Sequence, residues 1–158
     1  MSTKYKWDLR FLELAKHIAT WSKDPSTQVG AVIVDKNNRV VSLGFNGLPK
    51  GVHDTPKRLN DRELKHKIII HAERNAIIFS RRSLNGCTIY TWPFSPCATC
   101  AGMIIQSGIT RVVSPQCSPD LKERWGKDLK LAKQLFSEAG VKVDDYYRLK
   151  GDLEVKIC

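Results

Sequence analysis

Two short segments, His71-Ala72-Glu73 and Pro96-Cys97-Ala98-Thr99-Cys100, limit how this chain can fold. Each segment follows an extended or strand-like stretch and opens a segment of helical character. The two cysteines are three residues apart, so a single helical turn places both sulfurs on one face. The interval from residue 71 to residue 97 leaves room for one helix and one strand. We therefore expect two helix starts to meet at the same edge of a sheet.

The residue types in these segments are those of a metal site. A helix N-terminus favours the thiolate form of cysteine, which is the form that binds metal. His71 adds a third donor to Cys97 and Cys100. Catalytic zinc sites typically have three protein ligands and an open fourth position, whereas structural sites have four. Because the chain has no second C-x-x-C and no H-x-x-x-H, it predicts an open zinc site.

Glu73 lies two residues beyond the predicted histidine ligand. Zinc lowers the pKa of a bound water to about 7, and a neighbouring carboxylate is suited to take its proton. An acid in the first turn of a helix is also common because of the helix dipole alone. The combination is more informative, since H-x-E followed by P-C-x-x-C is typical of zinc-dependent nucleobase deaminases. Glu73 is therefore predicted to be the catalytic acid and base.

The composition is that of one globular domain covering residues 1–158, with 42% hydrophobic and 27% charged residues. The polar start of the chain and the lack of a long apolar run predict a cytoplasmic protein that does not enter a membrane. An odd number of cysteines favours reduced thiols or metal ligation over disulfides; they are Cys87, Cys97, Cys100, Cys117 and Cys158. The net charge of +10 indicates either a solvated basic surface or a specific anion site.

The apolar patterns predict helices that alternate with strands. Helices are expected at 7–21, 71–81, 96–106 and 127–138, and strands at 29–34, 39–43, 87–91, 110–114 and 141–147. The first two strands are expected to form a hairpin. The polar, glycine-bearing residues 44–67 are predicted to be a long loop. The alternation later in the chain indicates crossover connections and an α/β sheet covered on both faces.

Four segments resemble motifs of the cytidine deaminase superfamily, and within it of the deoxycytidylate (dCMP) deaminases, in the same order. They are Asp24–Ala31, Gly44–Gly47 with Pro49 and Gly51, His71–Ile77 and Pro96–Cys100. The likeness spans residues 7–147. It implies a three-layer α/β/α sandwich around a five-stranded mixed sheet, and a homo-oligomer, by family a hexamer. It also implies zinc-dependent hydrolysis of dCMP to dUMP and ammonia, which supplies the precursor of dTMP.

The same resemblance implies a set of substrate-binding residues. Asn46 would lie beside the sugar and Ser26 near the 5′-phosphate, and Ala72 and Pro96 complete the set. Asn46 is also what a turn before Gly47 would use, so both interpretations stay open. Trp92 to Phe94 either contact the base or pack at a strand end. His53 and His66 are predicted to be polar loop residues rather than metal ligands.

The resemblance further implies activation by dCTP and inhibition by dTTP, with Mg²⁺ bridging the phosphates of the effector. Phe45, Gly47 and Lys50 would belong to that allosteric site. Phe45 stands where the family usually has tyrosine, and Lys50 where it often has arginine. Glycines allow backbone N–H groups to approach an anion closely. The alternative is a surface loop that only covers the mouth of the active site.

Two other functions fit part of the pattern. A deaminase that acts on tRNA adenosine, or on another cytosine or guanine nucleoside or nucleobase, would share the zinc motifs. The basic charge favours a nucleic acid, but tRNA adenosine deaminases normally lack the segments 24–31 and 44–51. A non-catalytic zinc-stabilised nucleic-acid-binding module would need a fourth ligand, for which Cys87 and Cys117 have no suitable context. Cys87 begins an apolar strand and is predicted to be a small buried residue. A nucleotide is therefore the expected partner, rather than a nucleic acid.

Overall fold

The computed structural model describes residues 3–146, 148–149 and 152–153. Its centre is a five-stranded mixed sheet with the strand order β2-β1-β3-β4-β5. The strands are β1 (Gly30–Val34), β2 (Val40–Phe45), β3 (Thr88–Trp92), β4 (Arg111–Pro115) and β5 (Lys142–Tyr146). β1 pairs antiparallel with β2 and β3, whereas β3, β4 and β5 are parallel. A separate two-stranded ribbon pairs β6 (Arg148–Leu149) with β7 (Asp152–Leu153).

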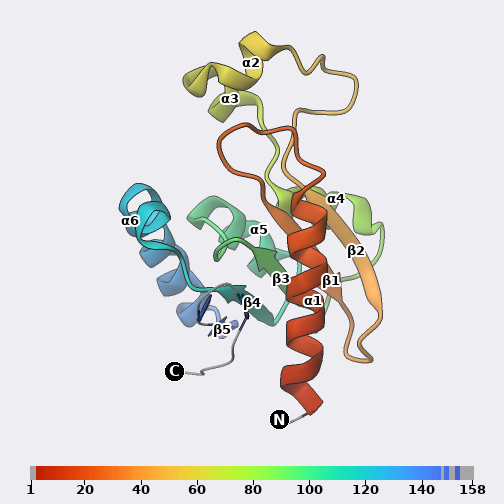
Figure 1. The fold of residues 1–158 in the computed structure, drawn as a ribbon. Coiled ribbons are helices and arrows are strands. Elements are labelled where there is room, and N and C mark those ends of the chain that lie inside the picture. The colour runs from red at the N-terminus through yellow and green to blue at the C-terminus, as the bar shows by residue number, and fades with distance from the viewer. Residues whose placement is uncertain (1–2, 147, 150–151, 154–158) are drawn as a thin grey trace.

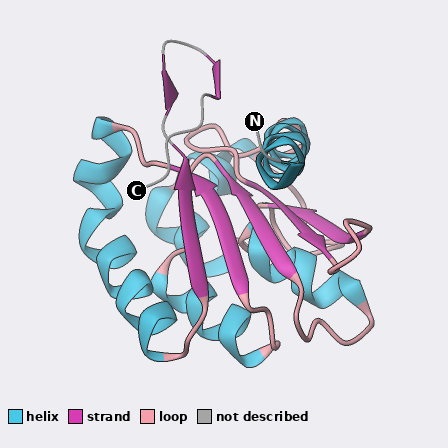
Figure 2. Ribbon diagram, turned by 90° about the horizontal axis from the view of Figure 1, so that it is seen from below, coloured by secondary structure: helices cyan, strands magenta, loops and turns pink. Residues whose placement is uncertain are grey.

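Six helices accompany this sheet in the described part of the chain. They are α1 (Thr3–Ala19), α2 (Pro56–Asn60), α3 (Arg62–Ile68), α4 (Ala72–Ser80), α5 (Ala98–Gln106) and α6 (Pro119–Glu138). α1 lies on one face of the sheet, and α4, α5 and α6 lie on the other (Figures 1 and 2). This confirms the expected α/β/α sandwich around a five-stranded mixed sheet. None of the described helices is both long and apolar enough to cross a membrane.

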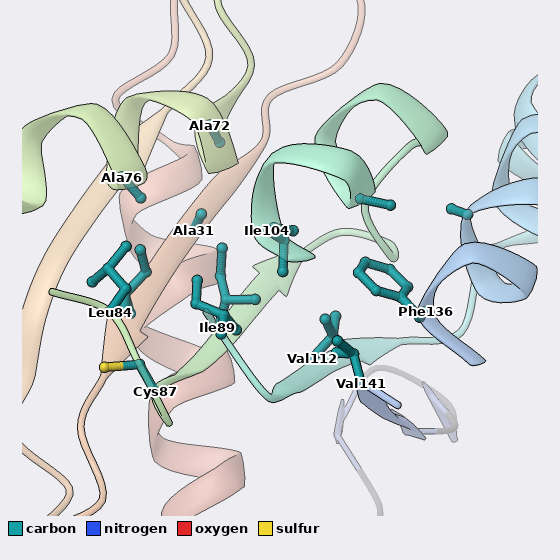
Figure 3. Close-up of a cluster of buried hydrophobic side chains, with 14 residues drawn as sticks. Ala31, Ala72, Ala76, Leu84, Cys87, Ile89, Ile104, Val112, Phe136 and Val141 are labelled. Carbon is teal, nitrogen blue, oxygen red and sulfur yellow. The ribbon is translucent and has the colours of Figure 1, made fainter. Parts of the chain in front are cut away.

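Each face of the sheet has its own core, because successive strand residues point to opposite sides. Val32, Val34 and Tyr90 pack with α1. Ile33, Ile89 and their neighbours pack with α4, α5 and α6, as Figure 3 shows around Ile104 and Phe136. The alternation in β1 therefore buries both faces of that strand, as expected for the inner strand of a three-layer domain.

Gly44 lets α4 lie unusually close to the sheet. A Cβ atom built at this position would be 2.4 Å from the carbonyl oxygen of Ala72 and 2.5 Å from the backbone nitrogen of Ala76. Any side chain at residue 44 would push the helix away. The glycine of this motif thus fixes the position of the first turn of α4, which carries His71 and Glu73.

The strand register collects several loops at one edge of the sheet. β3 and β4 are parallel, so both carboxyl ends lie at this edge. Gly30 pairs with both Phe45 and Trp92, which brings the start of β1 and the end of β2 to the same place. The segments 24–29, 46–47, 93–97 and 116–118 follow or precede these strand ends. The predicted motifs therefore meet although they are far apart in sequence.

The prediction of a continuous loop over residues 44–67 is wrong. Residues 56–68 form α2 and α3, which lie at the top of Figure 1. The side chains of Thr55 and Asp61 cap these helices by accepting hydrogen bonds from the backbone nitrogens of Arg58 and Leu64. Such caps satisfy backbone donors that short polar helices otherwise expose. The polar composition of this segment, taken alone, did not predict α2 and α3.

Two other predicted boundaries differ from the structure. α6 begins at Pro119 rather than at residue 127, because proline is favoured in the first helical turn and Gly126 is tolerated inside the helix. The fifth strand ends at Tyr146, and its predicted last residue, Tyr147, lies outside the described residues. The remaining predicted elements agree with the structure to within a few residues.

Asp8 ties α1 to the sheet through a buried polar cluster. Its carboxylate is 1% exposed and accepts hydrogen bonds from the hydroxyls of Tyr90 and Tyr146. Arg111 donates two further hydrogen bonds, at 2.6 and 2.8 Å. Burial by itself raises the pKa of Asp8, but the hydrogen bonds from Arg111 and the tyrosines outweigh it and lower that pKa.

Replacing Asp8 by asparagine is expected to lower the free energy of unfolding by about 3 kcal/mol at pH 7, because it leaves the Arg111 charge partly unpaired in the interior. Urea denaturation measures this change. The matched control on the same helix is Glu13→Gln, which breaks an exposed ion pair with Lys16 and should cost less than about 1 kcal/mol.

The pH dependence of the Asp8→Asn effect follows from the lowered pKa of Asp8. A carboxylate whose pKa is lower in the folded chain than its ordinary value of 3.8 stabilises the fold fully above that value and loses this effect as the pH falls through the lowered pKa. The difference between the wild type and Asp8→Asn should therefore be constant from pH 7 to pH 5 and shrink below about pH 4. A difference that grows on acidification would show that the ionised carboxylate is not the stabilising form.

Candidate zinc centre and nucleotide pocket

Two helix starts place the predicted metal donors together. His71 is the N-cap of α4 and Cys97 the N-cap of α5, and both have extended backbones. The Nδ1 atom of His71 lies 3.5 Å from the Sγ of Cys97 and 3.3 Å from the Sγ of Cys100. The backbone N–H of Cys100 also points to the Sγ of Cys97, at 3.5 Å.

The geometry of the three donor atoms fits zinc. In a tetrahedral site with Zn–S near 2.3 Å and Zn–N near 2.1 Å, the ligand atoms lie about 3.6–3.8 Å apart. The donor atoms of His71, Cys97 and Cys100 all lie within 4.8 Å of one another. Within the described ranges, no other group of three or more His, Cys, Asp and Glu residues is placed to hold a metal. Two sulfurs and one imidazole are also donors that zinc accepts readily.

The electrostatics of the cluster favour a thiolate. The hydrogen bond from Cys100 outweighs burial and, with the help of His71, lowers the pKa of Cys97 to about 4. The same hydrogen bond, together with burial, raises the pKa of Cys100. The hydrogen bond to Cys97 raises the pKa of His71. One sulfur is therefore ionised at neutral pH, and a bound cation favours ionisation of the second.

Glu73 occupies the first turn of α4 beside these donors. Its side chain is buried, with 4% of the residue exposed. The thiol of Cys100 lies 3.7 Å from its Oε2 atom. Burial raises the pKa of Glu73, while the positive charge of His71 opposes that rise. A carboxylate is thus held within reach of the metal position.

A pocket opens over this cluster, and three of the predicted site residues, His71, Glu73 and Cys97, lie in its wall. The pocket is partly open to solvent. The predicted substrate residues Ser26 and Asn46 also line it. The pocket therefore brings two of the zinc donors and the predicted substrate residues into one wall.

One wall of the pocket is a buried ion pair that the sequence did not reveal. The Nζ of Lys65 donates to Asp24 Oδ1 at 2.8 Å and to Ser26 Oγ at 2.9 Å. The side chains of Lys65 and Asp24 are 5% and 7% exposed. Lys65 belongs to α3, in the segment predicted to be a loop, and nothing distinguishes it in sequence from the other lysines.

Asn46 is held in the pocket wall by the protein itself. Its Oδ1 accepts a hydrogen bond from the backbone N–H of Val29 at 2.8 Å. Its Nδ2 donates to the carbonyl oxygen of Thr27 at 2.9 Å and to Asp24 Oδ2 at 3.4 Å. Asn46 therefore organises the loop before β1, and one lone pair of its amide oxygen is left for a ligand.

A second wall comes from α6 and contains further residues missed in the sequence. Trp125 stacks on His66 with an interplanar angle of 3° and on Phe94 with an angle of 23°. Arg124 donates to Thr27 Oγ1 at 3.3 Å. All five residues line the pocket. His66 is thus a helical pocket residue rather than the loop residue predicted, and Phe94 both packs and faces the pocket.

The remaining predicted residues lie outside the pocket wall. Ala72 and Pro96 are buried beside the zinc donors, next to His71 and Cys97 in sequence. Phe45 contacts Trp21 edge to face, and Gly47 pairs with Ile70. Lys50 is exposed. Ala72 and Pro96 therefore flank the metal cluster. Phe45 ends β2, and Gly47 and Lys50 lie on the segment that leads from β2 towards α2.

Comparison with known proteins places the chain in a family. The model of the cytidine and deoxycytidylate deaminase zinc-binding region matches residues 5–115. An uncharacterized deaminase in the luxG 3′ region of Aliivibrio fischeri is 49% identical over 138 residues, or 87% of this chain and 92% of that protein. The deoxycytidylate deaminase of Mus musculus is 38% identical over 142 residues, or 86% and 77% of the two chains.

A solved structure agrees with these relatives. The dCMP deaminase of cyanophage S-TIM5, in complex with dCMP and dUMP, superposes with a TM-score of 0.69 and 26% identity over 92% of this chain and 98% of that chain. The chain belongs to the cytidine and deoxycytidylate deaminase family, whose shared feature is a zinc-binding region. The resemblance noted in the sequence is thereby confirmed.

The three-donor geometry predicts that replacing a single donor abolishes zinc binding. His71→Ala or Cys97→Ala is expected to reduce bound zinc from about one ion per chain to less than about a tenth of that, since two remaining donors bind weakly. Elemental analysis after dialysis measures this. Cys87→Ala, a buried cysteine in the core beside β3, is the control and should keep its zinc. Full zinc in either donor variant would exclude that residue as a ligand.

Proposed function

We propose that this protein is a zinc-dependent hydrolase that converts dCMP to dUMP and ammonia. In this proposal, His71, Cys97 and Cys100 hold the zinc, and Glu73 transfers protons. One observation carries the proposal: a single pocket is lined by two of the three clustered zinc donors, His71 and Cys97, by the buried carboxylate of Glu73, and by the cations Lys65 and Arg124. Such a pocket offers both a hydrolytic centre and partners for a phosphate.

The substrate follows from the relatives and from the pocket. The mouse relative is named for dCMP, and the cyanophage neighbour was solved with dCMP and dUMP. The aromatic rings of Phe94 and Trp125 give the pocket flat apolar surfaces, and deaminases of this kind commonly hold a base between such surfaces. These features support a cytosine nucleotide rather than a larger nucleic acid.

Different residues of the site have different roles in the proposed reaction. Zinc, when bound at the three donors, supplies an activated water as the nucleophile. Beside a bound zinc, Glu73 would take a proton from the water and deliver protons to the cytosine ring and to the departing amino group. Water adds to C4 and forms a C–O bond, and the C–N bond breaks afterwards, so dCMP and water give dUMP and ammonia. Burial of Glu73 keeps bulk water away from its carboxylate.

Glu73→Gln is expected to keep zinc and fold but to lower kcat by at least about three orders of magnitude, because an amide cannot accept the proton. An ammonia-release assay with dCMP measures kcat, and elemental analysis confirms the metal. The control is Glu123→Gln, on the exposed side of α6, which should change kcat less than about twofold. Retention of a tenth or more of the wild-type activity by Glu73→Gln would refute the assigned role.

Arg124 is proposed to contact the 5′-phosphate, near Ser26 and Lys65. Arg124→Ala should lower kcat/KM for dCMP by about 10- to 100-fold, the effect of losing one charged partner, and leave kcat/KM for deoxycytidine nearly unchanged. The control is Lys127→Ala, an exposed cation on the same helix that does not line the pocket. Equal losses for nucleotide and nucleoside would place Arg124 away from the phosphate.

The wild-type enzyme is expected to prefer dCMP to deoxycytidine for the same reason. The pocket wall contains Lys65, Arg124 and the hydroxyl of Ser26, and a nucleoside lacks the phosphate that would interact with these groups. dCMP should therefore react at least about 100-fold more efficiently than deoxycytidine. A panel that also contains adenine and guanine nucleotides and tRNA separates this enzyme from a tRNA adenosine deaminase. Equal efficiency on deoxycytidine and dCMP would contradict the proposed substrate.

We also propose that dCTP with Mg²⁺ activates the enzyme and dTTP inhibits it, through the segment that carries Phe45, Gly47 and Lys50. This segment joins β2 to α2 and α3, and Lys65 of α3 lies in the substrate pocket. A homo-oligomer, by family a hexamer, agrees with the exposure of Ile78 and Phe79 on α4, at 57% and 55%. A cytoplasmic location agrees with a metal site built on the reduced cysteines Cys97 and Cys100.

A further inference from the structure

A second pocket lies at the same sheet edge as the zinc pocket and is separate from it. Its walls are the segment before α5, the residues that follow β4, and one side of α6. The ends of β4 and β5 reach it through Pro115 and Asp145. Crevices beyond the carboxyl ends of parallel strands are common ligand sites in α/β folds. None of the residues assigned above to catalysis or to the substrate lines it.

The α6 wall is a basic stripe with a gap in its middle. Lys122, Gly126, Lys130 and Lys133 all line the pocket. The last three follow Lys122 by four, eight and eleven residues, intervals that place them on one face of a helix. Gly126 adds no side chain between the lysines, and a Cβ there would meet only Lys122 Cγ, at 3.6 Å. Glycine is less favourable than alanine inside a helix, and at this position its missing side chain leaves space between the lysines.

The charges in this pocket are not balanced. Lys133 forms an ion pair with Asp145, whose other oxygen accepts a hydrogen bond from Ser114. Lys122 and Lys130 form no ion pair with any residue that the structure describes. The lining therefore contains three lysines and one carboxylate, and this net positive charge favours an anion.

A buried hydroxyl lies in the opposite wall. Ser95 is 5% exposed, and its Oγ atom forms no hydrogen bond with any described residue. Buried hydroxyls are normally paired, because an unpaired one costs free energy. The N-cap residue of α6, Ser118, makes no side-chain cap hydrogen bond, so the positive end of the α6 dipole is also near this edge. Both features favour an acceptor-rich ligand.

We propose that this second pocket, which we call the basic pocket (Ser95, Lys122, Gly126, Lys130, Lys133 and Asp145), binds a phosphate-bearing anion. α6 separates it from the zinc pocket, since Arg124 and Trp125 line one and Lys122 and Gly126 the other. An anion bound here would hold the helix that carries part of the substrate wall. The proposal does not depend on the substrate being dCMP, and it concerns residues other than Phe45, Gly47 and Lys50.

Calorimetric titration of the zinc-loaded chain with pyrophosphate, at constant ionic strength, tests the proposal. The double variant Lys122→Gln/Lys130→Gln should bind pyrophosphate at least about tenfold more weakly than the wild type. Lys6→Gln/Lys127→Gln removes the same charge from exposed positions outside both pockets and should change the affinity less than about twofold. Equal effects of the two double variants would overturn the proposal, because general attraction would then explain the binding.

Arg124→Ala separates the two pockets in the same titration. It should leave pyrophosphate binding within about twofold of the wild type, and Ser95→Ala should weaken binding by a few-fold through loss of one hydrogen bond. Loss of binding in Arg124→Ala, with binding unchanged in Lys122→Gln/Lys130→Gln, would place the anion in the zinc pocket and overturn the proposal. These outcomes do not involve turnover, so they are independent of whether dCMP is the substrate.

Discussion

The convergence of two helix starts at one edge of the sheet is the constraint on which the rest of the site depends. It brings the imidazole of His71 to within 3.5 Å of two sulfurs and buries the carboxylate of Glu73 beside them. Buried anions in such proximity repel one another and lose hydration. The positive ends of α4 and α5, and a bound divalent cation, offset that cost. The fold and the metal site are therefore mutually dependent.

A second buried interaction shapes the pocket above the zinc donors. The ion pair between Lys65 and Asp24 joins α3 to the loop before β1, and Asp24 also accepts a hydrogen bond from Asn46. Buried ion pairs rarely add much net stability, but breaking one is costly. This pair therefore fixes where Ser26 lies rather than strengthening the fold. It also connects the segment between β2 and α4 directly to the pocket.

The zinc donors could be predicted because the signal is local: three donors lie in two short segments of fixed spacing. The role of Lys65 could not be predicted, because its partner Asp24 lies 41 residues away in the sequence. The polar residues around Lys65 also indicated a loop, whereas the caps at Thr55 and Asp61 show that they form helices. Arg124 and Trp125 were missed for a related reason, since α6 was predicted to begin after Gly126. Long-range pairs and glycine-interrupted helices depend on tertiary contacts, which periodicity does not encode.

The central claim is that the zinc site is open, with three protein ligands and one position for water. X-ray absorption at the zinc edge of the full, zinc-loaded chain tests it most directly. We predict two sulfur neighbours at about 2.3 Å, one imidazole nitrogen at about 2.0–2.1 Å, and one further light atom from water. Three or more sulfurs, or two imidazoles, would describe a closed structural site and contradict the hydrolytic function.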